Sequence, residues 1–97
     1  MRIELKKFGT ILVSRPAGRE AFLVMSAYLT KDLPVDEEII IDFFGVKVLT
    51  PSWADEVITQ LAKQHKISFK HTDNPTVKST LKTLVRYSGL SVPDLQT

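Results

Sequence analysis

The stretch Glu38–Glu56, EIIIDFFGVKVLTPSWADE, decides the fold. It begins with the apolar run Ile39–Ile41, turns at Gly45, and reaches an amphipathic segment that starts near Ser52. A run that is apolar on both faces predicts a central strand covered by helices on each side. The strand–turn–helix order places hydroxyl side chains and free backbone N–H groups at one exposed edge. Such an edge can hold an anion, accept a phosphate or dock a partner.

Alternating and periodic apolar residues predict the other elements. Residues 2–6 alternate as a half-buried edge strand, and residues 11–13 resume an extended run, so these two pieces predict a hairpin. The predicted elements are, in chain order, strands at 2–6 and 11–13, a helix at 17–31, a strand at 39–41, a helix from Ser52, a strand at 66–70 and a helix from Pro75 to Gly89. This β(β)αβαβα order predicts an α/β fold, with a mixed sheet whose parallel central strands are flanked by helices.

Local signals mark the helix starts and the extent of the domain. Ser14 suits a cap of the first helix, and Asn74-Pro75 opens the last helix in cap-then-first-position order. Neither a linker nor an internal repeat interrupts the chain. We therefore predict one domain over residues 1–97, with 90–97 as a loose tail.

The composition excludes several classes of protein. The chain is 43% hydrophobic and 25% charged, as ordinary globular proteins are. It has no cysteine, which excludes disulfides, thiolate metal sites and a cysteine nucleophile. No apolar run approaches the ~20 residues that span a bilayer, and the charged alternation of residues 1–7 is not a signal peptide. We predict a cytoplasmic protein with no membrane partner.

The charge pattern and the motif search narrow the function further. Residues 36–56 carry six acidic side chains and one lysine, whereas basic residues are dispersed elsewhere. A nucleic-acid binder usually combines a basic face with interleaved aromatics, so nucleic acid is not an expected partner. The four glycines are isolated and form no phosphate loop, and His65 and His71 are not spaced as a metal pair. We expect no cofactor, no metal and no enzymatic activity.

The start of the second helix can be read in two frames. In one, Ser52 caps the helix by accepting a hydrogen bond from the N–H of Asp55, with or without an additional regulatory role. In the other, Thr50 supplies the cap and Pro51 takes the first helical position. The residues alone leave both frames open.

Charged and aromatic residues near this start are further candidates. Asp42, Asp55 and Glu56 suggest acid–base chemistry or a magnesium site. However, Asp55 and Glu56 are adjacent on a helix and point in different directions, so they make a poor metal chelate. We expect these two acidic side chains to complement the helix dipole and to face a partner. Trp53, the single tryptophan, is either a lid on the core or an exposed partner anchor.

Two arginines flank the start of the first helix. Arg15 and Arg19 either pair with the acidic segment or bind an anion, and pairing or simple solvation is the simpler interpretation.

Several motifs together point to a family. The strand end Ile41–Val46, IDFFGV, is followed by the helix start Ser52–Glu56, SWADE. Phe8-Gly9 and Ser14-Arg15 precede and open the first helix, and Asn74–Lys78 opens the last. With these motifs the chain resembles, over nearly its whole length, the small STAS-like domains of bacteria. That group has no assigned function and is related to anti-sigma factor antagonists.

The resemblance implies a phosphorylation switch. In the wider family a serine at the start of this helix is phosphorylated by a partner kinase that is also the anti-sigma factor, and phosphorylation breaks the complex. By position this serine is Ser52, with Thr50 as the neighbouring candidate. The chain departs from the better-known antagonists because no aspartate precedes Ser52 and the bulky Trp53 follows it.

Together these observations predict a non-enzymatic regulatory module that binds an anti-sigma or kinase-like protein through the segment Gly45–Glu56. The predicted contact residues are Gly45, Pro51, Ser52, Trp53, Asp55 and Glu56. The alternative is a ligand- or nucleotide-sensing module with an anion site at the N-terminus of the helix near Ser52.

Overall fold

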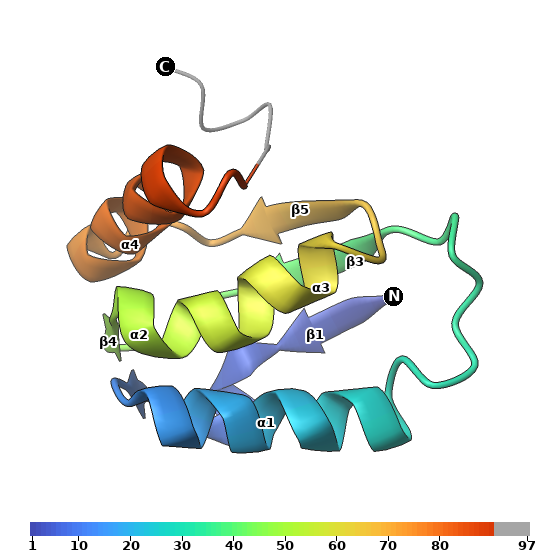
Figure 1. Cartoon of the computed structure of the whole chain (residues 1–97). Helices are drawn as coiled ribbons and strands as arrows, with labels where there is room; N and C mark the ends of the chain where they lie inside the picture. The colour runs from blue at the N-terminus through green and yellow to red at the C-terminus, as the bar shows by residue number, and fades with distance from the viewer. Residues whose placement is uncertain (91–97) are drawn as a thin grey trace.

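The computed structural model describes residues 1–90 of the chain (Figure 1). Its elements are β1 (Arg2–Glu4), the 3-10 helix η1 (Leu5–Phe8), β2 (Ile11–Leu12), α1 (Arg15–Tyr28), β3 (Ile39–Asp42), β4 (Val48–Leu49), α2 (Pro51–Ala54), the π-helical turn η2 (Asp55–Thr59), α3 (Gln60–Ala62), β5 (Ile67–Lys70) and α4 (Pro75–Tyr87). The predicted α/β class is confirmed.

The main sheet has three parallel strands in the order β1-β3-β5, so the predicted central position of Ile39–Ile41 is confirmed. Ile3, Ile41 and Phe69 share one row of this sheet. The predicted edge position of the first strand is confirmed as well.

The predicted hairpin between residues 2–6 and 11–13 is wrong. The η1 turn and Gly9, at φ 131°, redirect the chain so that β2 pairs in parallel with β4 in a separate two-stranded sheet. All pairings in residues 1–90 are parallel, which also corrects the prediction of a mixed sheet. Side chains of α4 close the outer edge of β4: Thr76 Oγ1 accepts from Leu49 N at 3.0 Å, and Thr80 Oγ1 donates to Leu49 O at 2.9 Å.

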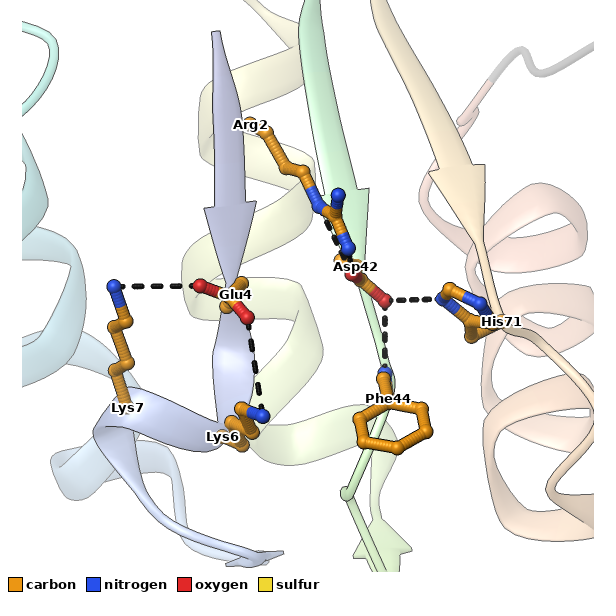
Figure 2. Close-up of polar contacts among 7 residues, drawn as sticks. All are labelled: Arg2, Glu4, Lys6, Lys7, Asp42, Phe44 and His71. Carbon is orange, nitrogen blue, oxygen red and sulfur yellow. Dashed lines mark hydrogen bonds and ion pairs between the residues drawn. The ribbon is translucent and has the colours of Figure 1, made fainter.

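The helices cover one face of the main sheet, not both. In Figure 1 they lie in front of the strands, and Figure 2 views the sheet from the other side. Ile39 and Ile41 are fully buried towards the helices, whereas Ile40 is only partly buried. Ile40 lies in register between Arg2 and Ser68, whose polar side chains share its outer row. The run of three isoleucines therefore occurs in a sheet that helices cover on one face only, and the predicted cover on each side is wrong.

The first helix is capped as predicted. The hydroxyl of Ser14 accepts from Ala17 N at 3.2 Å, and α1 ends at Tyr28 instead of residue 31. Gly18 allows α1 to pack closely on α2, because a Cβ at this position would lie 2.6 Å from the carbonyl oxygen of Trp53. The glycine that weakens the first turn locally is thus needed for helix packing.

The second and last helices also follow their sequence signals. The apolar side chains of the second predicted helix are buried along η2 and α3, among them Val57, Ile58 and Leu61. Asn74 Oδ1 accepts from the backbone N–H groups of Thr76 and Val77, so the predicted cap is confirmed.

The end of the described chain differs from the prediction in one residue. Leu90, placed in the predicted tail, is buried in the core, whereas residues 91–97 lie outside the described part. No helix within residues 1–90 is long and apolar enough to cross a membrane.

Candidate functional site

The helix start follows the Thr50-Pro51 frame. Thr50 is the N-cap residue and Pro51 occupies the first helical position. The hydroxyl of Thr50 does not cap the helix; it donates instead to the carbonyl oxygens of Leu12 and Val13, at 3.4 and 3.1 Å. It thereby ties the helix start to the end of β2. The frame in which Ser52 caps the helix is wrong, because Ser52 lies one residue inside it.

The hydroxyl of Ser52 is not used by the fold. The side chain is partly buried in the first turn of α2, and within residues 1–90 it makes no hydrogen bond. The backbone N–H groups of the first turn have no intrahelical acceptor, since only from Ala54 onwards does an N–H reach a carbonyl one turn back. Ser52 therefore combines an unengaged hydroxyl with the positive end of a helix.

Trp53 belongs to the core. Its side chain is 1% exposed and packs among the buried residues beneath α1. The structure thus favours the core lid among the two sequence interpretations. The partner-anchor interpretation fails for this packing, because a buried indole offers no contact area.

Asp55 and Glu56 are held by the first helix. Arg15 Nη1 lies 3.2 Å from Asp55 Oδ2 and 3.4 Å from Glu56 Oε1, while Ser88 Oγ donates to Asp55 Oδ1 at 2.9 Å. Burial raises the pKa of Asp55, but the hydrogen bonds from Ser88 and Arg15 outweigh it and leave that pKa below its usual value. Arg15 thus pairs with the acidic segment, one of the two roles expected for it, whereas Arg19 is simply exposed.

The accessible part of the predicted site is small and largely apolar. Gly45 and Pro51 are exposed. Beside the Thr50–Val13 contact, the side chains of Ile11 and Val13 are 62% and 45% exposed. We call Ile11, Val13, Pro51 and Ser52 the helix-start surface. Sequence reasoning missed its β2 half because the β2–β4 pairing was not predicted.

A second polar cluster surrounds Asp42 on the open face of the main sheet (Figure 2). The Asp42 side chain is 0% exposed, although it ends the central strand. Oδ2 accepts hydrogen bonds from the guanidinium of Arg2, with Nε at 3.0 Å. Oδ1 accepts from Phe44 N at 2.9 Å and lies 2.7 Å from Nδ1 of His71. Both oxygens are therefore engaged.

These contacts set the ionisation of Asp42. Burial raises its pKa, but the hydrogen bonds from Phe44, Arg2 and His71 outweigh this effect and lower the pKa to about 2. The bond to Phe44 N fixes the turn that follows β3, which closes with Val46 N donating to Phe43 O at 3.0 Å. Asp42 therefore anchors the turn that leads to the helix-start surface.

The residues around Asp42 are exposed and partly strained. His71 adopts φ 58°, which side chains other than glycine rarely do. The ring of Phe44 is 58% exposed, packs edge-on against His71, and has Lys6 Nζ at 5.0 Å from its centre. A buried aspartate in an apolar run signals a cationic partner, yet the sequence could not name Arg2 and His71, which lie far away along the chain. Within residues 1–90 no three His, Asp or Glu side chains form a metal-binding group.

The parallel sheet, the tight turn after its central strand and the helix start define a small α/β domain of the STAS type. A family model described as a STAS-like domain of unknown function (DUF4325) matches residues 27–77, and the chain belongs to this family. The matched range holds β3, the turn, the second helix and β5. No curated protein and no solved structure matches the chain.

Proposed function

We propose that this chain is a non-enzymatic regulatory module that binds a protein partner through the segment Gly45–Glu56 and is switched by phosphorylation of Ser52. The observation that supports the switch most is the hydroxyl of Ser52, which is partly accessible and makes no hydrogen bond within residues 1–90. The resemblance to anti-sigma factor antagonists suggests an anti-sigma or kinase-like regulator as the partner.

Ser52 is a better acceptor of phosphate than Thr50. The Thr50 hydroxyl donates to two carbonyl oxygens of the β2 end, so modification would break the contact between the helix start and that strand. Modification of Ser52 breaks no such contact. We therefore assign the switch to Ser52 and a structural role to Thr50.

The phosphate would act on the partner more than on the fold. It adds a charge of about −1.5 to −2. The helix N-terminus favours this charge by ~0.3–1 kcal/mol, whereas Asp55 and Glu56 repel it. Arg15, now shared between these two carboxylates, is the nearby cation that limits the repulsion. The opposing effects leave the domain folded, and the new charge stands beside apolar Val13 and Pro51, where it disfavours a partner's apolar contact.

The affinity of the protein partner for four forms of this chain tests the proposal. The forms are the wild type and the variants Ser52→Ala, Ser52→Glu and Ser79→Glu. We expect Ser52→Ala to bind like the wild type and Ser52→Glu to bind at least tenfold more weakly. Ser79→Glu, which adds the same charge at an exposed serine of α4, is the matched control and should bind normally. Equal affinities of the Ser52→Glu and Ser79→Glu proteins would reject the switch.

An anion or nucleotide sensor remains the second candidate function. The free N–H groups of Ser52 and Trp53 favour it, while the proline at the first position removes one donor and the two following acids oppose an anion. Thermal unfolding with inorganic phosphate and with ATP separates the candidates. A stabilisation that Ser52→Glu abolishes supports the sensor, whereas no stabilisation with either probe removes it.

A further inference from the structure

His71 and Asp42 form a histidine–carboxylate pair on the open face of the main sheet (Figure 2). Nδ1 of the imidazole lies 2.7 Å from Oδ1 of Asp42, and the ring directs its other nitrogen, Nε2, away from this carboxylate. The His71 side chain is 50% exposed, and within residues 1–90 its Nε2 atom makes no hydrogen bond. One ring nitrogen is therefore held by the fold, while the other is left for a second molecule.

The carboxylate decides which nitrogen of His71 carries the hydrogen. Asp42 is ionised at neutral pH, because its pKa is about 2, and an ionised carboxylate only accepts hydrogen bonds. Nδ1 must therefore donate, so the lone pair of the neutral imidazole is on Nε2. The negative charge of Asp42 also stabilises the positive charge that the ring gains when Nε2 forms a new bond. A histidine nitrogen with these properties is suited to act as a nucleophile.

The stability of the fold alone does not explain this use of a histidine. Without His71, each oxygen of Asp42 still has a hydrogen-bond donor, which is Phe44 N for Oδ1 and the Arg2 guanidinium for Oδ2. Yet His71 adopts φ 58°, a conformation that is uncommon for residues other than glycine. Strained residues of this kind cluster at functional sites, where the surrounding structure holds the side chain in place.

Two lysines make the surroundings of His71 suitable for a phosphoryl group. Lys6 Nζ lies over the ring of Phe44, which packs edge-on against His71. Lys70 directly precedes His71 and is exposed. A phosphoryl group adds a charge of about −1.5 to −2, and the two lysines carry the opposite charge.

We propose that His71 is a phosphoryl acceptor, modified on Nε2 by an activated donor whose phosphorus bears an amine or a carboxylate leaving group. The Nε2 lone pair forms the new N–P bond while the bond between phosphorus and the leaving group breaks, and that group departs with the bonding electron pair. The hydrogen on Nδ1 stays there, so the phosphorylated ring is a cation that faces the carboxylate of Asp42. The site lies on the open face of the sheet and does not depend on the role proposed for Ser52.

Incubation of the full chain with phosphoramidate, and separately with acetyl phosphate, tests the proposal. Phosphorus NMR and intact mass follow the product without acid treatment, because N–P bonds are labile to acid. With at least one donor we expect one phosphoryl group on Nε2 of His71, added at least about tenfold faster than to N-acetylhistidine. The donor that reacts identifies the class of leaving group. Rates within about twofold of N-acetylhistidine for both donors, modification on Nδ1, or no modification would overturn the proposal.

Three variants locate the reaction. His71→Gln should remove the product, since the other histidine, His65, is buried; a product that persists in this variant would overturn the proposal. Asp42→Asn should slow the reaction at least about fivefold, because the ring loses both its fixed tautomer and the facing charge. Asp73→Asn, at an exposed aspartate of the same loop, is the matched control and should change the rate less than about twofold. Equal rates in the two asparagine variants would reject the activation by Asp42.

Nitrogen NMR of the wild type keeps the role of Asp42 testable if Asp42→Asn fails to fold. In the neutral ring of His71 we expect the hydrogen on Nδ1 and the lone pair on Nε2. The opposite tautomer would overturn the proposal, because Nε2 would then have no lone pair for the attack on phosphorus.

Discussion

Asp42 and Ser52 belong to the same strand–turn–helix unit, yet their side chains are in opposite situations. Asp42 is fully buried, and both of its carboxylate oxygens are bound by residues from three parts of the chain. Ser52 is partly accessible, and within residues 1–90 its hydroxyl is bound by none. A polar side chain whose hydrogen bonds are all made within the protein stabilises the fold. A polar side chain without an internal partner is available to bind another molecule.

Replacing Asp42 with Asn should have the largest effect on stability. The change keeps the shape but removes the charge that Arg2 and His71 face, and it introduces an amide N–H₂ group that cannot accept their bonds. Breaking a fully buried ion pair costs about 3–5 kcal/mol. Because Arg2 and His71 are half exposed, we expect a loss of about 2–3 kcal/mol in the free energy of unfolding.

Urea denaturation measures this loss. Asp73→Asn, at an exposed aspartate in the same loop as His71, is the matched control and should change stability by less than about 0.5 kcal/mol. If both variants lose the same free energy, Asp42 is not the anchor of the turn.

The carboxylate of Asp42 should make the free energy of unfolding depend on pH. The pKa of Asp42 is about 2 in the folded protein and 3.8 ordinarily, so the folded state favours its ionised form. The resulting stability is fully present above pH 3.8 and is lost as the pH falls towards 2. Allowing for screening at the half-exposed partners, we expect it to amount to about 1–2 kcal/mol. The unfolding free energies of the wild type and of Asp42→Asn should therefore approach each other as the pH falls from 3.8 towards 2. A constant difference between the two proteins over this range would contradict the role given to the ionised Asp42.

Two substitutions of His71 distinguish the contribution of its hydrogen bond to stability from that of its backbone strain. Alanine at this position loses the contact to Asp42 and keeps the unfavourable φ of 58°, whereas glycine loses the contact but accepts this conformation. We expect His71→Ala to lower the unfolding free energy by about 1–2 kcal/mol and His71→Gly by about 1 kcal/mol less. Thermal melts of the two variants suffice, and a glycine variant less stable than the alanine variant would argue against strain.

The smallest effects are expected at the helix start. Thr50→Val removes the hydroxyl that binds the β2 end and should cost about 1 kcal/mol. Ser52→Ala removes a hydroxyl without an internal partner and should change stability by less than about 0.5 kcal/mol. Chemical denaturation of both variants compares them directly. A loss near 1 kcal/mol for Ser52→Ala would show that this hydroxyl serves the fold after all.

The features that the sequence predicted correctly are encoded locally. Apolar periodicity and the cap residues Ser14 and Asn74 act within a few positions, so the helices could be located from short windows. The apolar run Ile39–Ile41 was enough to identify the central strand of the sheet.

The features that the sequence did not predict depend on contacts between segments that lie far apart along the chain. The partner of β2 lies beyond the whole of α1 and β3, and no local residue pattern distinguishes this parallel pairing from a hairpin. The cluster of Asp42 likewise depends on the register that brings Arg2 beside the end of β3. The burial of Trp53 follows from the close approach that Gly18 permits, which cannot be read from either residue alone.

The contrast between a bound Asp42 and a free Ser52 leads to one direct measurement: mass spectrometry of the protein purified from its source cell, with the modified residue mapped. The account predicts a phosphate on Ser52 and none on Thr50. A phosphate on Thr50 or on exposed serines such as Ser79 in place of Ser52, or no phosphate on any residue, would contradict it.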